Sequence, residues 1–460
     1  MLREAARPPE TPAAAATTSS SRKAPTAPHL ALSSPAGPFI GTHAATDPAR
    51  VPARPAGLPA RLGGMALTDR TAKTAHTHDK AGTHDKAGTV PGIVIPAGML
   101  PSDGRFGSGP SKVRPEAIEQ LVSHAGVLGT SHRQAPVKSL VRRLRSGLSD
   151  LFGLPQGYEV ALGNGGTTAF WDIATFCLID KKSQHLSFGE FSSKFAKAAQ
   201  AAPWLEDPEV IESPVGTHPW AEATAAVDLY ALTHNETSTG VMMDLQRPPG
   251  AAPDALVAVD GTSAAAGLRF GAQEVDAYYF APQKGLASDG GLWIALMSPA
   301  AVSRAERIKA SGRFVPSFLD LATALENSRL DQTYNTPALA TIVLALAQLE
   351  WILEGGGLEF SCGRCDRSAE ILYGWAEASS FATPFVAKPD ERSHVVATID
   401  FDPSVDAATV AKVLRANGIV DTEPYRRLGR NQLRVAMFPA IEPSDVEALT
   451  ACIDFVVGSL

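Results

Sequence analysis

The sequence is poor in the residues that several classes of protein require. Its 460 residues include four cysteines, too few and too scattered for a disulfide framework. Charged residues make up only 19%, and acids outnumber bases to give a formal net charge of -7. Binding nucleic acid requires a basic face that neutralises phosphates, so this charge excludes that class. No run of about 18 uninterrupted apolar residues occurs, and no membrane span is expected.

The scarcity of cysteine favours a soluble protein in the reducing cytoplasm. Two of the four, Cys362 and Cys365, form a Cys-x-x-Cys pair. A zinc site of this type needs a second pair of ligands. The chain offers no such pair, so we interpret both cysteines as ordinary helix residues and expect no bound metal.

Residues 1–100 differ in composition from the rest of the chain. They are rich in Ala, Pro, Thr, Ser and Gly and include a tandem repeat, THDKAG twice, at 77–88. Such a segment cannot bury enough apolar surface to offset the entropy of ordering. We interpret it as a disordered, low-complexity arm, or as the product of an upstream start codon with Met65 as the true beginning. Its basic residues also resemble a transit peptide, but proline is too frequent for a good amphipathic helix.

From about residue 103, strand-like and helix-like patterns alternate, which predicts an α/β fold. Helical periodicity covers 137–152 and 338–354. Five short apolar segments are predicted strands: 158–163, 228–232, 255–260, 277–281 and 292–296. We therefore expect a large α/β domain over residues 101–354 with a mostly parallel central sheet.

Three consecutive glycines at 355–357 end this pattern. A smaller α+β domain is predicted over residues 355–460, with helices at 366–378, 407–417 and 443–457 and strands at 394–401 and 432–438. A large and a small domain leave a cleft between them, which is a common location for a ligand site.

Polar residues follow the predicted strands, where α/β sheets bind their ligands. A glycine-rich turn, LGNGGTT at 162–168, leads into a helix that begins near Thr168. Its backbone N–H groups favour a phosphate, although glycine and threonine at a helix start are also ordinary capping residues. Asp260 ends an apolar strand. It fits either a cap of the following turn or a partner for a protonated pyridine nitrogen.

Two more features follow later strands. Lys284 comes after the strand 277–281; it is either a solvated loop lysine or an amine whose pKa apolar surroundings depress, which makes it a nucleophile toward an aldehyde. The segment 234–240 forms a hydrogen-bonded turn or brings Asn235 and Thr237 to a bound ring. In combination, a phosphate cradle, a strand-end aspartate and a lysine one strand later follow the order of a pyridoxal-phosphate enzyme.

From about residue 103 to the C-terminus, the chain resembles the phosphoserine aminotransferases, a family of the class V, fold-type I pyridoxal-phosphate enzymes, and most closely the actinobacterial form. The resemblance rests on the segments GRFGSGPSKVRPE, GTSHRQAPVK, HNETSTG, YYFAPQK, QTYNTPA and NGIVDTEPYRRLGRNQLRVAMFPA. It implies pyridoxal 5'-phosphate as cofactor and a homodimer. The implied reaction transfers an amino group from L-glutamate to 3-phosphohydroxypyruvate, giving O-phospho-L-serine and 2-oxoglutarate in serine biosynthesis.

The resemblance also implies roles for matching residues. Lys284 forms the Schiff base with the cofactor, and Asp260 pairs with the pyridine nitrogen. The other cofactor contacts fall on seven residues: Gly166, Thr167 and Gln283 at the phosphate, Phe191 over the ring where other members have tryptophan, Thr237 at the ring hydroxyl side, and Asn335 and Thr336 at the phosphate of the neighbouring subunit. For the substrate, the resemblance points to Ser108, Arg133 and Arg434 near the carboxylate. Arg426 and Arg427 are the candidates for the substrate phosphate, since a guanidinium binds phosphate well, although the family's usual His-Arg pair is not reproduced at the same spacing.

Three alternative functions stay open, two of them enzymatic and one regulatory. A transaminase of the alanine–glyoxylate or serine–pyruvate type acts on unphosphorylated substrates. A lyase such as cysteine desulfurase needs a mobile cysteine over the cofactor, whereas Cys362 and Cys365 lie in a predicted helix. A non-catalytic regulator that only binds the cofactor needs a DNA-binding module, and neither the charge nor the arm supplies one.

Overall fold

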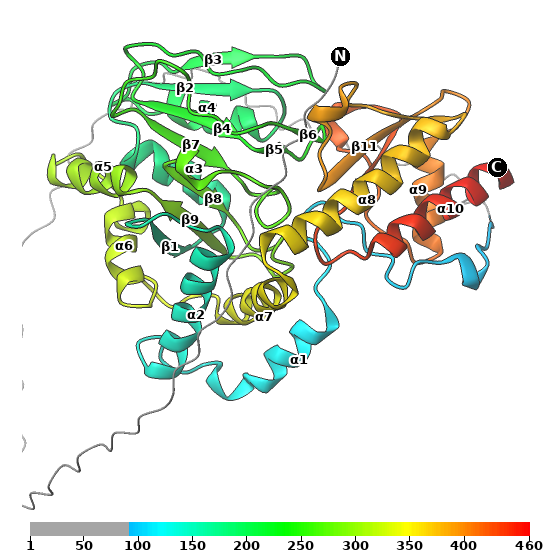
Figure 1. The fold of residues 1–460 in the computed structure, drawn as a ribbon, viewed down its shortest axis with the longest axis horizontal. Coiled ribbons are helices and arrows are strands. Elements are labelled where there is room, and N and C mark those ends of the chain that lie inside the picture. Colours follow the sequence, from blue (N-terminus) through cyan, green and yellow to red (C-terminus); the bar gives the residue numbers. More distant parts are fainter. Residues whose placement is uncertain (1–91) are drawn as a thin grey trace, which may run out of the picture. The chain divides into compact units, whose positions relative to one another are not determined.

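The central element of the fold is a seven-stranded sheet (Figure 1). The computed structural model describes residues 92–460, and in this part of the chain the strand order is β1-β9-β8-β7-β4-β2-β3. β9 is antiparallel to both neighbours, and all other pairs are parallel. The strands are β1 (Glu159–Asn164), β2 (Ser183–Ser187), β3 (Glu209–Glu212), β4 (Leu229–Thr233), β7 (Leu256–Asp260), β8 (Ala277–Phe280) and β9 (Leu292–Met297). The expected α/β fold with a mostly parallel sheet is confirmed.

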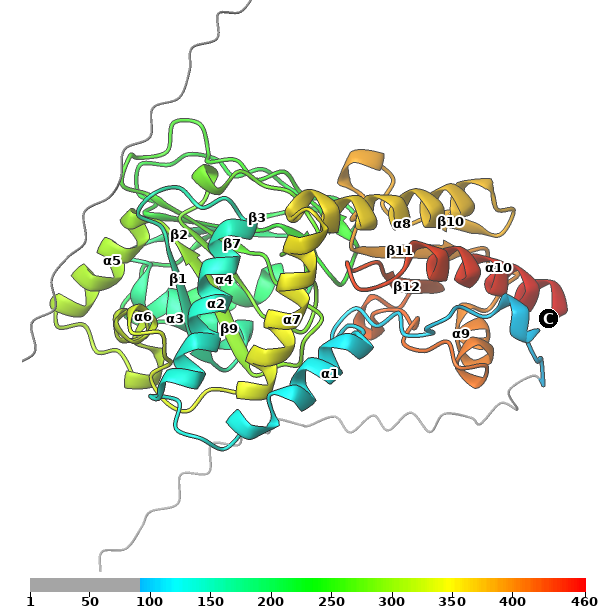
Figure 2. The same cartoon turned by 60° about the horizontal axis from the view of Figure 1, so that its bottom comes forward.

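Helices cover both faces of this sheet, as the turned view in Figure 2 shows. One face carries α2 (Ala135–Leu151) and α7 (Leu339–Gly355), and α1 (Pro115–Ser123) packs beside α7. The other face carries α3 (Thr167–Cys177), α4 (Ser192–Gln200), α5 (Pro299–Ala310) and α6 (Leu321–Arg329). Side chains alternate between the two layers because successive residues of a strand point to opposite faces. In β7, Val257 and Val259 pack with the first group of helices, and Leu256 and Ala258 with the second.

Two strands of the sheet were not predicted. β2 has the polar sequence Ser-Gln-His-Leu-Ser, yet its first four residues are buried. Hydrogen bonds make that burial possible: Ser183 Oγ lies 2.9 Å from His185 Nε2, and Gln184 Nε2 donates to Glu222 O at 2.8 Å. β3 lies at the edge of the sheet, where alternate side chains reach solvent. Neither strand shows the continuous apolar run by which the other five were recognised.

A second, three-stranded antiparallel sheet has the order β10-β11-β12. Its strands are β10 (Ala382–Pro384), β11 (Val396–Phe401) and β12 (Gln432–Ala436), and the helices α8 (Leu358–Ala378), α9 (Ala407–Ala416) and α10 (Pro443–Ser459) pack around the same hydrophobic core. We call these elements the C-terminal part. The expected α+β character is confirmed, whereas a domain boundary at residue 355 stays a prediction, because all described residues belong to one compact unit.

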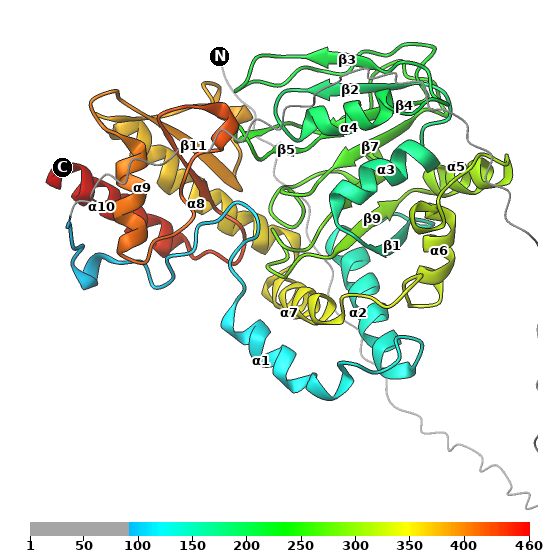
Figure 3. The same cartoon turned by 180° about the vertical axis from the view of Figure 1, so that it is seen from behind.

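The first described residues belong to the core of the C-terminal part, and Figure 3 shows this segment running beside α9 and α10. Ile95 and Phe106 are buried in that core, and the amide of Ile95 donates to Asn417 Oδ1 at 2.9 Å. Residues 92–100, which the sequence analysis assigned to the arm, are therefore held in the fold. The rest of the arm, with its tandem repeat and the possible start at Met65, lies outside the described residues.

Gly355 ends α7, and Gly356 and Gly357 separate it from α8. Gly356 and Gly357 have φ angles of 122° and 75°, a region that favours glycine. Within residues 92–460, no single helix is long and apolar enough to cross a membrane; α7 and α8 satisfy that test only as a pair, and they are bent by 91° at their junction.

The short elements complete the described chain. A small hairpin is formed by β5 (Asn235–Glu236) and β6 (Val241–Met242). Single 3₁₀ turns occur at η1 (Ala97–Met99), η2 (Ala125–Val127), η3 (Ala272–Glu274), η4 (Ser317–Leu319), η5 (Pro389–Glu391) and η6 (Arg426–Leu428).

Helix starts differ in how their first N–H groups are satisfied. Side-chain caps begin α5, α6 and α9, where Ser298, Asp320 and Asp406 accept backbone hydrogen bonds. α3 and α4 begin just beyond the ends of the parallel strands β1 and β2, and neither has a cap from its own N-cap residue. Their first N–H groups need partners from elsewhere.

Candidate active site

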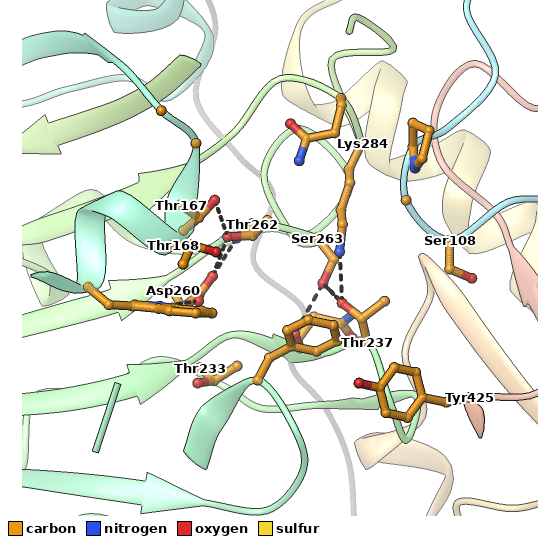
Figure 4. Close-up of a pocket in the computed structure, with 18 of the residues that line it drawn as sticks. Ser108, Thr167, Thr168, Thr233, Thr237, Asp260, Thr262, Ser263, Lys284 and Tyr425 are labelled. Carbon is orange, nitrogen blue, oxygen red and sulfur yellow. Dashed lines mark hydrogen bonds between the residues drawn. The ribbon is translucent and has the colours of Figure 1, made fainter. Parts of the chain in front are cut away.

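A cavity of about 430 Å³ lies where the parallel strands end (Figure 4). Its sheet side is formed by the turn after β1, the loop after β4, the end of β7 and the loop after β8. Ser108, from the N-terminal segment, and Tyr425 and Arg434, from the C-terminal part, complete the lining. The topology explains this convergence, because the carboxyl ends of parallel strands share one edge of the sheet.

Lys284 projects into this cavity from the loop after β8. The residue is only 7% exposed, and its Nζ donates to Thr237 Oγ1 at 3.0 Å. Burial lowers the pKa of Lys284 to about 8, with a smaller contribution in the same direction from Arg434. Gly109 lies so close that a Cβ there would be 2.8 Å from Lys284 Cε. The lysine is thus enclosed, partly neutral near physiological pH and fixed in direction.

Asp260 ends β7 and is 6% exposed. One carboxylate oxygen, Oδ2, accepts from Trp171 Nε1 at 3.0 Å. The other, Oδ1, accepts from the amide and hydroxyl of Thr262 at 2.9 and 2.5 Å. Burial raises the pKa of Asp260, and these hydrogen bonds act in the opposite direction. The carboxylate does cap the following turn, as one interpretation expected; its pairing with a pyridine nitrogen stays a prediction.

The turn between β1 and α3 brings the uncapped N-terminus of α3 to the cavity. Gly166 is the N-cap of α3, has a φ of 98° and leaves open space where a Cβ would project. Because glycine has no side chain, Gly166 cannot cap the helix itself. The hydroxyls of Thr167 and Thr262 lie close to this helix start, 2.9 Å from each other. Gln283 also lines the cavity, and its buried Oε1 has no hydrogen-bond partner in the described chain. A phosphate group is the ligand that such a helix start favours.

The loop after β4 carries a hydrogen-bonded series beneath Lys284. Thr237 Oγ1 donates to Ser263 Oγ at 2.8 Å, and Ser263 Oγ donates to Asn235 O at 3.1 Å. The ring of Phe191 lies across the same cavity, with its centroid 5.4 Å from Lys284 Nζ and 6.0 Å from the ring of Tyr425. These side chains leave room for a planar group between the sheet and the C-terminal part.

The structure brings most of the predicted site residues together. The cavity is lined by Ser108, Gly166, Thr167, Phe191, Thr237, Asp260, Gln283, Lys284 and Arg434. Arg426 and Arg427 line an adjoining hollow that shares Ser108 and Arg434 with it. Three others, Arg133, Asn335 and Thr336, are exposed and do not line the cavity. Asn335 and Thr336 lie instead beside Asn164, whose Nδ2 donates to Asn335 Oδ1 at 2.5 Å and to Thr336 O at 2.8 Å.

Several residues of the cavity were not predicted: Trp171, Thr233, Thr262, Ser263 and Tyr425. Trp171 lies one helical turn beyond Thr167 on α3, so its position on the same face was available from the sequence. Thr262 follows Asp260 by two residues, the spacing of an ordinary turn cap. No spacing in the sequence relates Tyr425 to the strand ends, because it belongs to the C-terminal part.

The cysteines lie away from this cavity. Cys362 and Cys365 are buried in α8, as the sequence analysis expected of helix residues, and Cys365 belongs to the core of the C-terminal part. Burial raises the pKa of Cys362 to about 12, so its thiol is a poor source of thiolate. Desulfurase chemistry therefore has no cysteine in place. In residues 92–460, no cluster of three His, Cys, Asp or Glu side chains forms a potential metal site.

Comparison with known proteins identifies the family. The model of the class V aminotransferases matches residues 106–422. A putative phosphoserine aminotransferase of Mycolicibacterium vanbaalenii is 60% identical over 366 residues, which cover 80% of this chain and 98% of that protein. The phosphoserine aminotransferase of a Nocardioides species is 60% identical over 368 residues, with the same coverage.

Solved structures show the same fold. The phosphoserine aminotransferase of Bacillus circulans subsp. alkalophilus superimposes with a TM-score of 0.69 at 22% identity, over 78% of this chain and 99% of that one. A phosphoserine aminotransferase of Trichomonas vaginalis with pyridoxal phosphate bound gives a TM-score of 0.64 at 19% identity, over 76% and 99%. At these identities the likeness concerns the fold alone.

The residues of the cavity suit pyridoxal phosphate, the cofactor of this class. An uncapped helix start is present for the phosphate, a buried carboxylate for the ring nitrogen and a buried amine for the aldehyde. The unpaired buried oxygen of Gln283 and the open space at Gly166 are consistent with a ligand at this position. The chain therefore belongs to the class V, pyridoxal-phosphate-dependent aminotransferases and, within them, to the phosphoserine aminotransferase family.

Proposed function

We propose that the chain transfers the amino group of L-glutamate to 3-phosphohydroxypyruvate, giving 2-oxoglutarate and O-phospho-L-serine for serine biosynthesis. The observation that carries this proposal is that the buried amine of Lys284 and the guanidinium of Arg434 line the same cavity. Amino transfer between two acids needs an amine nucleophile and a fixed cation that orients each carboxylate. The names of the relatives at about 60% identity support the phosphorylated substrate.

The bound cofactor supplies an aldehyde for the amino group and a ring that takes up the electron pair of the broken Cα–H bond. Lys284 would hold the cofactor covalently through Nζ. As a free amine, the same Nζ would take up the proton from the substrate Cα and carry it during the transfer. Thr237 keeps Nζ in place, and the lowered pKa of Lys284, about 8, leaves a usable fraction of neutral amine. Trp171 and Thr262 hold both oxygens of Asp260, which would keep this carboxylate directed at the ring nitrogen of the cofactor.

Arg434 and Ser108 bind the substrate carboxylate in this proposal. Arg434 Nε is buried without a hydrogen-bond partner in the described chain, while its Nη1 donates to Thr237 O at 3.3 Å. A carboxylate that accepts from this guanidinium satisfies that donor. Ser108 Oγ is likewise buried and unpaired. Arg426 and Arg427 take the substrate phosphate from the adjoining hollow, and Arg427 must then release Glu190, with which it pairs at 2.5 Å.

We propose a homodimer with shared active sites. Arg133, Asn335 and Thr336 are exposed in the single chain. Thr336 Oγ1 lies 3.5 Å from Nδ1 of His132, the neighbour of Arg133, so the two segments present their polar groups together. Large apolar residues accompany them: Leu128 is 40% and Tyr334 46% exposed. Such a surface suits burial against a second copy, whose cavity these polar residues complete.

The cytoplasm is the proposed location. All four cysteines are free and buried. A reducing compartment keeps thiols in that state.

The proposal is tested by steady-state kinetics with L-glutamate as donor. We expect kcat/KM for 3-phosphohydroxypyruvate to exceed that for hydroxypyruvate by at least about 100-fold, because an ionic site left unpaired by the smaller acid costs several kcal/mol. Equal or better turnover of glyoxylate or pyruvate indicates the alanine–glyoxylate or serine–pyruvate type of transaminase instead.

A further inference from the structure

Glu236 is a fully buried carboxylate in the strand β5, directly before Thr237. Its exposure is 0%. Oε2 accepts from the backbone amides of Phe191 and Ser192 at 3.0 and 2.8 Å. Oε1 accepts from the amide and hydroxyl of Ser238 at 3.1 and 2.7 Å. Burying a carboxylate is costly unless hydrogen bonds replace its water, and here each oxygen has at least two donors.

Two of these donors are N–H groups that the start of α4 leaves free. The N-cap of α4 is Phe191, whose side chain has no acceptor. Glu236 therefore provides the cap from a segment more than forty residues away. A negative charge at a helix N-terminus is also favoured by the helix dipole. The carboxylate thus ties the loop after β2 to the loop after β4.

The loop 189–192 rests directly against this side chain. A Cβ at Gly189 would lie 2.4 Å from both Cγ and Cδ of Glu236, so only glycine allows the approach. The amide of Glu190 donates to Ser238 Oγ at 3.1 Å, which adds a second link to the same hairpin. The next residue, Phe191, lines the cavity. The position of its ring therefore depends on a backbone that Glu236 and Ser238 hold.

We infer that Glu236 is a positioning residue, which holds the loop 189–192 so that the ring of Phe191 lies over the cofactor. The inference rests on the proposed contact of Phe191 with the cofactor. Glu236 does not line the cavity, so it acts through the position of Phe191.

A double-mutant cycle on cofactor affinity tests this inference. The dissociation constant of pyridoxal phosphate is measured by equilibrium dialysis on the cofactor-free chain and on E236Q, F191A and the double variant. E236Q places an amide N–H₂ or a weaker acceptor against the two backbone donors, and we expect affinity to fall about tenfold. If Glu236 acts through Phe191, the double variant binds no more than about twofold more weakly than F191A alone.

The matched control is D445N. Asp445 is another buried carboxylate that accepts from a backbone amide, Ser102 N at 2.7 Å, but it lies in the C-terminal part outside the cavity lining. We expect D445N to lose thermal stability and to keep the wild-type affinity. Equal loss of affinity in D445N and E236Q overturns the inference, because the effect then reflects the fold in general. If E236Q does not fold, E236D makes the same cycle with a shorter side chain that retains the charge.

Other outcomes separate this inference from the proposed function. Wild-type affinity in E236Q, or losses that multiply in the double variant, contradict the role of Glu236 alone. Wild-type affinity in F191A contradicts the proposed role of Phe191 and the inference with it. No substrate is present in the assay, so the identity of the keto acid does not affect the result.

Discussion

Lys284 Nζ donates a 3.0 Å hydrogen bond to Thr237 Oγ1, and both side chains are buried. The lysine comes from the loop after β8 and the threonine from the loop after β4, so β7 lies between their strands in the sheet. β7 ends in Asp260, the third polar group of the arrangement. The spacing of the strands thus sets the spacing of the amine, the hydroxyl and the carboxylate.

Replacing Lys284 by alanine should leave a folded protein that forms no covalent link with pyridoxal phosphate. Turnover should fall by more than about 10³-fold, because both the attachment point and the proton carrier are lost. Borohydride reduction followed by peptide mass spectrometry measures the link. The control is K112A, which removes a second buried lysine that pairs with Asp103 and Asp445 and does not line the cavity. A reducible link in K284A contradicts the assignment.

The reactivity of Lys284 should depend on pH with a midpoint near 8 in the cofactor-free chain. Burial lowers the pKa of Lys284 to about 8, so the neutral, reactive amine becomes dominant as the pH rises through that value. An ordinary lysine reaches the same fraction only near pH 10.4. Labelling by a small amine-reactive reagent, followed residue by residue, gives the midpoint. In D260N it should move lower still, since the carboxylate of Asp260 favours the protonated amine. A midpoint near 10 would show that the lysine is not desolvated.

Gly109→Ala should displace Lys284. The added methyl group would lie 2.8 Å from Lys284 Cε, and a φ of 146° is itself unfavourable for alanine. We expect formation of the covalent link to slow by at least about tenfold, with a loss of stability of about 1–3 kcal/mol. G126A is the control, because Gly126 has no atom within 4 Å of the added position. Normal kinetics of cofactor attachment in G109A would mean that this contact does not constrain the lysine.

Trp171→Phe should weaken catalysis less than removal of the carboxylate that it holds. W171F deletes one of the three hydrogen bonds to Asp260, which predicts a loss in kcat/KM of about tenfold. D260A removes the charge beside the ring nitrogen and should cost on the order of 10²-fold or more. W351F, on α7 outside the cavity lining, serves as the control. If W171F loses as much as D260A, the indole has a role beyond orienting this carboxylate.

The elements predicted correctly from the sequence are those that a pattern of neighbouring residues defines. The five strands with continuous apolar runs were recognised, as were Asp260 and Lys284 at the ends of two of them. β2 was missed because its burial depends on hydrogen bonds between polar side chains and segments remote in the sequence. Trp171 forms its bond with Asp260 across 89 residues, a distance over which periodicity carries no information.

The roles of residues that contact remote segments of the chain, or a second copy of it, could not be predicted from local sequence patterns. Tyr425 lines the cavity together with residues of the strand ends, although it belongs to a remote segment of the chain. Glu236 appeared only as one polar residue of a turn, yet it caps a helix from another loop. Arg133, Asn335 and Thr336 rest on the family resemblance, and their proposed roles require a second copy of the chain.

The most direct test of the proposed amino transfer is to follow the two half-reactions through the absorbance of the bound cofactor. We expect L-glutamate to convert the protein-bound Schiff-base band to the amine form, and 3-phosphohydroxypyruvate to restore it at least about 100-fold more efficiently than glyoxylate or pyruvate. If L-glutamate leaves the band unchanged, or if the unphosphorylated keto acids restore it equally well, the proposed reaction is contradicted.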